Sequence, residues 1–332
     1  MMVVKEVPMN TVQTQPDTEA TSRLMHFPVS FFAMVMGLSG LTIAWKTAGA
    51  DMLPSATLNL GIFTSAIMLV ISGIYFMKLV RYPQAVLDEL HHPVRLNFFP
   101  AFSISLLLLS VVWNSHEQTS LLLWSAGTLI QFLMTLYVMN SWIHHTHYTL
   151  SHANPSWFIP VVGNVIVPIS GVHLGFIELS WFFFSIGIVF WVVLMTMILY
   201  RLFFHEPLPA RLTPMLFILL APPSIGFISY SALTGGLDNT GRILYYIALF
   251  LSMLLLSNIL RFIRIPFFIS SWAYSFPLAA LTIATTKMGH LLQSFWFDMF
   301  AKILLAFLSL LLLWLVVQTV KAIAGKKLCQ PE

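Results

Sequence analysis

Ten apolar stretches, each long enough to cross a lipid bilayer, dominate this chain. They lie near residues 27–47, 56–78, 97–114, 119–139, 157–176, 179–200, 212–232, 243–261, 267–287 and 298–320. A spanning helix needs roughly 20 apolar residues, and 58% hydrophobic with only 8% charged residues excludes an ordinary soluble fold. Lipid offers the backbone no hydrogen bonds, and the stretches lack the alternation of barrel strands. The sequence therefore predicts an all-α polytopic membrane protein with ten transmembrane helices.

Prolines occur inside every odd-numbered stretch and inside none of the even-numbered ones. They include Pro28, Pro100, Pro160, Pro168, Pro222, Pro223 and Pro277. A proline within a helix removes one backbone hydrogen bond and clashes with the preceding turn. This pattern indicates two helix populations, a kinked set that lines a pathway and an unbroken set that holds it in place.

The odd stretches begin near residues 27, 97, 157, 212 and 267, so a unit of two helices repeats five times. A two-helix unit preserves its direction across the membrane, so the five units run parallel. We therefore expect five helical hairpins in a quasi-fivefold arrangement around a central pore. The rival is an inverted five-plus-five transporter repeat, but the sixth stretch holds only Gly187 as an interruption, which favours the ring.

The distribution of Lys and Arg predicts that both termini are cytoplasmic, in an integral plasma (inner) membrane protein. Twelve of the 16 basic residues fall on the side of the termini, and the other side has Lys46, Arg242, Lys287 and Lys302. We expect a disordered cytoplasmic tail over 1–25, a channel domain over 26–323 and a short cytoplasmic tail over 324–332.

The interiors of stretches two to four and six to nine contain no Asp, Glu, Lys or Arg. A proton-coupled carrier usually keeps an intramembrane relay group, which a channel does not need. Helices broken by proline would present unpaired N–H groups and positive dipole ends inside the membrane. An anion-attracting cytoplasmic mouth would add Arg95, Arg201, Arg211, Arg261 and Arg264. These features favour small, weakly hydrated anions.

Several motifs resemble one family. Residues 271–288, SWAYSFPLAALTIATTKM, resemble the ninth helix of the plant guard-cell slow anion channels and of the bacterial tellurite-resistance protein TehA, and residues 154–171, NPSWFIPVVGNVIVPISG, resemble their fifth. HHPVRLNFFPAFS and LLAPPSIGFISY extend the likeness. The resemblance implies five hairpins around a pore, a homotrimer with one pore in each protomer, and gating by a phenylalanine of helix nine that matches Phe276. The family also includes dicarboxylate or malate carriers and sulfite exporters.

From these observations the sequence predicts a passive channel for small monovalent anions such as chloride or nitrate, with Phe276 as the pore gate. The alternative is a carrier or exporter of dicarboxylate, sulfite or tellurite-type oxyanions. Phe276 could also be one more packing aromatic among 28 phenylalanines. The expected kink or lining positions are Pro277, Gly37, Pro100, Pro160, Gly163, Pro168, Pro222 and Pro223. Glycines in membrane helices also serve close packing, and Asn164 is expected to bond to backbone freed by Pro160 or Pro168.

A third possibility, an intramembrane metalloenzyme, would use the histidines at 144, 145, 147 and 152. No cysteine or acid accompanies them, and no nucleotide-binding loop or catalytic triad is visible. We therefore expect no catalytic residues, no metal and no cofactor. The expected partners are small inorganic or organic anions, the lipid bilayer and two further copies of the chain, without nucleic acid.

Overall fold

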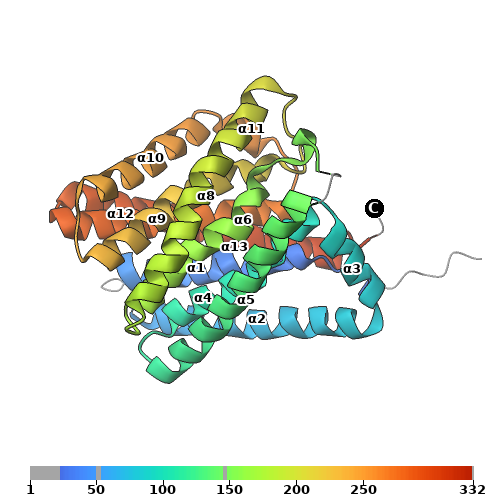
Figure 1. Ribbon diagram of the computed structural model, residues 1–332, viewed down its shortest axis with the longest axis horizontal. Coiled ribbons are helices and arrows are strands. Elements are labelled where there is room, and N and C mark those ends of the chain that lie inside the picture. The colour runs from blue at the N-terminus through green and yellow to red at the C-terminus, as the bar shows by residue number, and fades with distance from the viewer. Residues whose placement is uncertain (1–22, 50–53, 145–147, 331–332) are drawn as a thin grey trace, which may run out of the picture.

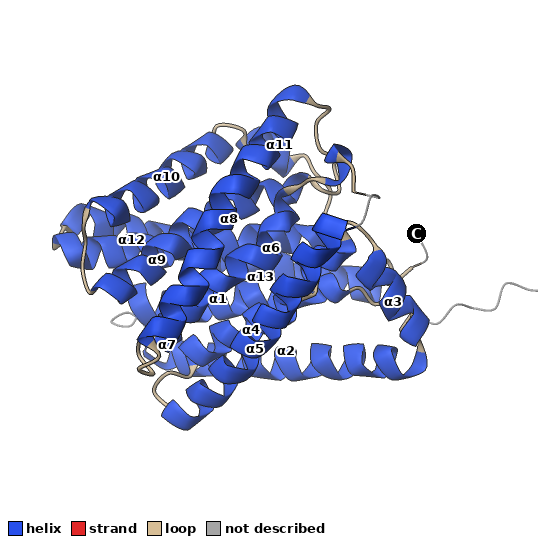
Figure 2. Cartoon of the chain, in the orientation of Figure 1, coloured by secondary structure: helices blue, strands red, loops and turns tan. Residues whose placement is uncertain are grey.

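The computed structural model describes residues 23–49, 54–144 and 148–330 of the chain. The structure is 83% helical, and the described ranges contain no strand (Figure 2). The expectation of an all-helical membrane protein is therefore confirmed. The predicted N-terminal tail, 1–25, lies almost wholly outside the described residues.

The odd-numbered apolar stretches form the inner helices of the bundle. Each begins with a short 3-10 turn and continues as an α-helix. The 3-10 turns are η1 (Val29–Phe31), η2 (Arg95–Phe98), η4 (Pro155–Trp157), η6 (Thr213–Leu220) and η7 (Ile269–Tyr274). The helices that follow are α1 (Phe32–Ala48), α4 (Pro100–Val112), α6 (Phe158–Val162), α9 (Ala221–Thr234) and α12 (Ser275–Leu292). Only the α6 stretch is broken again, by the turn η5 (Gly163–Ile166) before α7 (Val167–Gly171).

The even-numbered stretches form long, unbroken helices around this inner set. They are α2 (Pro54–Arg81), α5 (Glu117–His144), α8 (Ile177–Phe204), α10 (Asn239–Leu256) and α13 (Phe295–Ala324). Within their most apolar windows only 22–39% of residues are buried, against 72–78% in the inner stretches that contain α1, α4 and α9. In Figure 1, α2 runs along the lower edge of the bundle and α10 along its upper left edge. Their exposed leucines and phenylalanines form the kind of surface that lipid covers.

The inner segments close on themselves. Helix α1 packs against α4, and α4 packs against α6, η5 and α7. The α7 and η5 segments pack against α9, which packs against α12, and α12 returns to α1. Each outer helix packs against the inner segment that precedes it in the chain. Five consecutive inner segments therefore surround a common centre.

Eight helices in the described ranges are long and apolar enough to cross a membrane. The predicted spans at 157–176 and 267–287 are not among the eight. The first forms a shorter apolar helix, Pro155–Gly171, because it ends at Gly171 and a turn follows over 172–175. The second, in α12, carries three threonines, Lys287 and His290, which lower its mean hydropathy.

Two short helices were not predicted, and one predicted span is shorter than expected. Helix α3 (Pro83–His91) follows α2, and α11 (Ile259–Ile263) follows α10, which ends at Leu256 rather than near 261. A third short element is the 3-10 turn η3 (Leu150–His152). Helix α10 ends where the side chains of Ser257 and Asn258 both donate to the carbonyl of Leu254, at 2.7 and 3.1 Å. Such side chains compete with the backbone for helical hydrogen bonds.

Most of the prolines predicted to kink the inner helices lie close to the point where a 3-10 turn passes into an α-helix, and not in the middle of a regular α-helix. Pro100 is the first residue of α4, and Pro222, Pro223 and Pro277 lie in the first turns of α9 and α12. Pro28 precedes η1 in extended conformation. A first-turn residue needs no N–H, so proline is accommodated there. The expectation of unpaired N–H groups at the starts of the half-helices is wrong, because carbonyls of the preceding 3-10 turns accept these N–H groups. For example, the N–H of Ser275 donates to the carbonyl of Trp272.

Candidate functional site

The five inner segments enclose an apolar cavity of about 50 Å³. Every one of them contributes to its wall, and among the described residues no ionisable side chain lines it. The lining residues are Ala33, Met36, Phe98, Ala101, Ile104, Phe158, Ile159, Val162, Gly163, Ile166, Ile218, Ala221, Pro222, Ile225, Trp272, Ala273, Phe276 and Pro277. The only polar side-chain group in this set is the indole N–H of Trp272, which donates to Thr319 Oγ1 of α13 at 3.0 Å.

The lining residues recur every three or four positions in each segment. Phe98, Ala101 and Ile104 form one such face, and Ile218 and Ile225 lie on another. This spacing places the residues on one side of a helix. Sequence reasoning missed most of them, because an apolar residue in a wholly apolar stretch carries no distinguishing signal. The three-to-four-residue spacing identifies lining residues only when it is known which face of each helix turns toward the cavity.

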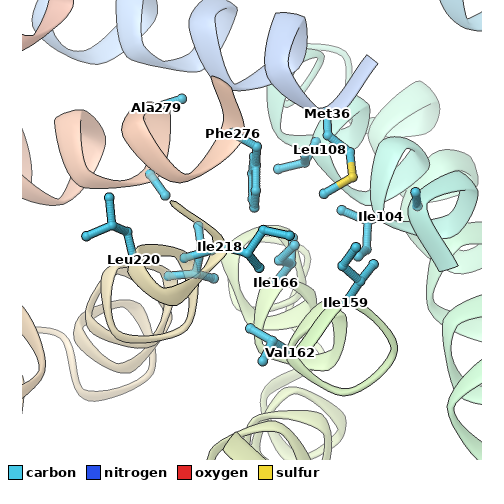
Figure 3. Close-up of a cluster of buried hydrophobic side chains, with 14 of the residues drawn as sticks. Met36, Ile104, Leu108, Ile159, Val162, Ile166, Ile218, Leu220, Phe276 and Ala279 are labelled. Atoms are coloured by element: carbon cyan, nitrogen blue, oxygen red, sulfur yellow. The ribbon is translucent and has the colours of Figure 1, made fainter. Parts of the chain in front are cut away.

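Phe276 lies in the first turn of α12 and is 8% exposed. Figure 3 shows its ring pointing from α12 into the space that Met36, Ile104, Ile159 and Ile218 surround. Those four residues come from the other inner segments, so the ring occupies the centre of the bundle. The adjacent turn is anchored from behind by the bond from Trp272 to α13.

Three other predicted positions also border the cavity, namely Pro277, Gly163 and Pro222. Gly37 does not; a Cβ at this position would overlap the side chain of Ser275 on α12, so Gly37 lies at a helix contact. The remaining predicted prolines, Pro100, Pro160, Pro168 and Pro223, are also not lining residues, and each lies in the first turn of a helix.

Asn164 bonds to backbone near the break, as expected, though at a different carbonyl. Its Nδ2 donates to the carbonyl of Val161 at 2.9 Å and to Thr135 Oγ1 at 3.0 Å. The carbonyl of Val165, three residues before Pro168, instead accepts from Ser229 Oγ of α9 at 2.5 Å. Side chains of neighbouring helices thus supply the hydrogen bonds that the broken segment lacks.

Two lysines lie toward the C-terminal ends of inner helices. Lys287 Nζ of α12 donates to the carbonyl of Ile228 in α9 at 3.1 Å. Lys46 Nζ of α1 donates to the carbonyl of Val112, the last residue of α4, at 3.1 Å and also to Asn114 Oδ1. Cations near helix C-termini are stabilised by the carbonyl end of the helix dipole. Lys46 and Lys287 place positive charge beyond the apolar cavity.

The five arginines predicted to form a basic mouth differ in exposure. Arg95 begins η2 and is half-buried, whereas Arg211, Arg261 and Arg264 are exposed. Arg201, in the last turn of α8, is buried, and its Nη1 donates to the carbonyl of Glu206 at 3.0 Å. All five lie near starts of inner segments or ends of outer helices, which a parallel repeat brings to one side of the bundle.

Two of the four histidines of the predicted cluster, His145 and His147, lie outside the described residues. His144 Nδ1 is 3.0 Å from the carbonyl of Asn140, and His152 Nδ1 is 3.3 Å from Thr149 Oγ1. Within the described ranges, no group of three or more His, Cys, Asp or Glu side chains is placed to hold a metal ion.

An all-helical bundle with lipid-type outer surfaces and an enclosed, uncharged centre defines an integral membrane protein of the channel or transporter class. Residues 26–320 match the SLAC1 family, described as voltage-dependent anion channels, and the chain belongs to this family. The resemblance seen in the sequence motifs is thereby confirmed.

Three similar proteins illustrate the range of the family. The S-type anion channel SLAH3 of Arabidopsis thaliana is 31% identical over 316 residues, which cover 92% of this chain and 50% of that protein. The guard cell S-type anion channel SLAC1 of the same plant is 28% identical, over 83% of this chain and 52% of its own length. The tellurite resistance protein TehA homolog of Haemophilus influenzae is 26% identical, over 84% and 86%. The chain spans about half the length of these plant relatives.

Proposed function

We propose that this protein is a passive channel for small monovalent anions, in which each protomer conducts through its own central cavity and the ring of Phe276 closes the path. The observation that carries the proposal is the cavity itself. Five inner segments enclose it, Phe276 lies at its centre, and no ionisable side chain among the described residues borders it.

The character of the wall supports a channel over a coupled carrier. An apolar constriction blocks ions because it cannot hold enough water to keep them hydrated. Proton coupling would require an intramembrane Asp, Glu or His as a relay, and the cavity wall contains none. The basic residues near the segment ends favour anions over cations. The curated names of SLAH3 and SLAC1 describe S-type anion channels.

The same proposal includes the arrangement in the membrane. Ten spans form five hairpins, with α6 to α7 and α12 as the fifth and ninth spans. Both termini lie in the cytoplasm, because twelve of the 16 Lys and Arg residues fall on that side. Three copies form a homotrimer in which each chain keeps a separate pore.

The test is Phe276→Ala, measured as anion current in oocytes or planar bilayers. Removing the ring should widen the constriction and raise the current by about tenfold or more. Phe183→Ala is the matched control, because Phe183 of α8 is equally buried but packs against Phe132 of α5, away from the cavity. We expect no rise in current with this control. An unchanged current in Phe276→Ala, with normal surface protein, would contradict the proposal.

The second candidate is a carrier or exporter of dicarboxylate, sulfite or tellurite-type oxyanions. It is favoured by the TehA homolog, 86% of whose length this chain matches. Reconstituted vesicles distinguish the two. A channel gives flux that follows the anion gradient and membrane potential, whereas a carrier gives flux that saturates with malate or sulfite and depends on a proton gradient.

A further inference from the structure

The third inner segment, which contains α6, η5 and α7, is the only one of the five described inner segments that is broken twice, and it forms a large part of the cavity wall. Phe158, Ile159 and Val162 of α6 and Gly163 and Ile166 of η5 line the cavity. Pro160 and Pro168 have no N–H, so this part of the wall lacks two backbone hydrogen bonds that a regular helix would have. Its position therefore depends on what lies behind it.

Behind this wall lies Gln131 of the outer helix α5, whose side chain is fully buried. Its Nε2 donates to the carbonyl of Pro160 at 2.8 Å. Its Oε1 accepts from Ser103 Oγ of α4 at 2.7 Å. One amide thus joins two neighbouring inner segments, and both of its polar atoms are bonded.

Gly163 shows how closely this amide approaches the cavity. A Cβ at position 163 would overlap the amide group of Gln131. Gly163 itself borders the cavity. Its φ of −51° is open to any residue, so the glycine is required for the close approach and not for its backbone conformation. The Gln131 amide therefore lies directly behind a residue of the cavity wall.

Thr135, one turn further along α5, strengthens the same point. Its Oγ1 donates to the carbonyl of Pro160 at 2.8 Å and accepts from Asn164 Nδ2 at 3.0 Å. Two donors from α5 therefore converge on one carbonyl of the broken segment. In low-dielectric surroundings such a network strongly favours a single geometry.

We propose that Gln131 is a positioning residue of the conduit, by which we mean the anion path through the central cavity. By holding the Pro160 carbonyl and Ser103 and by packing on Gly163, it fixes the distance of the third inner segment from the axis and so sets which anions fit. This inference rests on the proposed channel function and extends it to a residue of an outer helix that does not touch the conduit.

The test uses the full chain in the Phe276→Ala background, so that the gate does not limit the current. Gln131→Met keeps the length of the side chain and removes both hydrogen bonds. We expect the permeability of thiocyanate relative to chloride, taken from reversal potentials, to rise severalfold, because a wall that is held less firmly admits the larger, weakly hydrated anion more readily. A loss of folded protein would reduce the current but leave the reversal potential unchanged.

The matched control is Thr128→Val. Thr128 is buried on the same helix, three residues before Gln131, and its hydroxyl has no hydrogen-bond partner in the structure. We expect its permeability ratio to equal that of Phe276→Ala alone. If Gln131→Met does not reach the membrane, Ser103→Ala removes the bond to Gln131 Oε1, and Thr135→Val removes the bonds of Thr135 Oγ1 to Pro160 and Asn164. Each variant should shift the ratio in the same direction.

A double-mutant cycle tests the contact with Gly163. Gly163→Ala should shift the ratio because its methyl group displaces the amide, and Gln131→Ala should make room for that methyl group. The double variant should therefore differ from the sum of the two single effects. Additive effects, or an unchanged ratio in every variant of Gln131, Ser103 and Thr135, would overturn the inference.

Hydrogen exchange of the purified protein separates this result from the channel proposal. Backbone amides over 158–167 should exchange faster in Gln131→Met than in Thr128→Val, whether or not the protein conducts. Absence of current in Phe276→Ala would count against the channel alone. Unchanged exchange over 158–167 would count against the role of Gln131 alone.

Discussion

At the scale of single residues, a buried ion pair lies near the start of the first inner segment. Lys78 Nζ of α2 lies 2.9 Å from Glu89 Oε2 of α3, and their side chains are only 2% and 4% exposed. Lys78 also donates to the carbonyl of Phe27, and Tyr75 donates to Glu89 Oε2, each at 2.9 Å. The pair therefore ties α2, α3 and the chain entering η1 together.

Replacing one member of this pair should be costly. Glu89→Gln leaves the buried ammonium of Lys78 without a counter-charge, and removing one partner of a buried pair typically costs about 3–5 kcal/mol. We expect a clear fall in the melting temperature of the purified protein. The control is Asp298→Asn, which breaks the exposed Lys302–Asp298 pair, 2.8 Å apart, and should cost less than about 1 kcal/mol. Equal shifts in the two variants would contradict the assignment.

At the scale of elements, the contact between α1 and α12 determines where Phe276 sits. A Cβ at Gly37 would overlap Ser275, and one at Gly40 would lie 2.6 Å from Ala279 Cβ. Small residues on both helices let their backbones approach closely. The same α12 turn carries Phe276, so the spacing of these helices sets how far its ring reaches into the cavity.

Gly37→Ala should push α12 away from α1 and destabilise the protein by about 1–3 kcal/mol, the usual cost of overpacking. Adding Ser275→Gly removes the obstruction and should restore most of the loss, as seen in thermal unfolding. Gly73→Ala in α2 is the comparison, because a Cβ there meets nothing within 4 Å. That variant should be neutral or stabilising by up to about 1 kcal/mol. A Gly37→Ala protein as stable as Gly73→Ala would exclude the close packing.

These two glycines also show what could be predicted from the sequence. Hydropathy placed most apolar stretches within a few residues of the observed helices, because a bilayer imposes a minimum length on any apolar run. The roles of Gly37 and Gly73 depend instead on which helix lies opposite, which no local pattern records. The prolines were located correctly as markers of the inner segments, but their first-turn positions depend on 3-10 turns that have no clear sequence signal.

Only part of the candidate site could be predicted from the sequence. Phe276, Pro277, Gly163 and Pro222 border the cavity, and a motif or a proline marked each of them. Met36 and the other aliphatic lining residues resemble their neighbours in every local property. Gln131 is a polar residue within an apolar stretch, but its contact with the third inner segment depends on which face of α5 turns inward, and no local pattern records that.

At the scale of the whole molecule, the cavity belongs to one chain. Its lining residues all come from the five inner segments of a single copy, and these segments pack in a closed order from α1 to α12 and back. The outer helices separate this centre from any neighbouring copy. An assembly should therefore contain as many conduits as chains, each able to conduct without the others.

Mixing wild-type chains with Phe276→Ala chains tests this independence. With equal amounts of the two, independent conduits should pass about half the current of Phe276→Ala alone, because half of the pores lack the ring. A conduit shared by three subunits and closed by any one wild-type ring would pass only about one eighth, the fraction of trimers without a wild-type chain. Current in oocytes, scaled to surface protein, distinguishes these values. A linear dependence on the variant fraction would locate the path inside each chain, whereas a cubic one would place it on the axis between subunits.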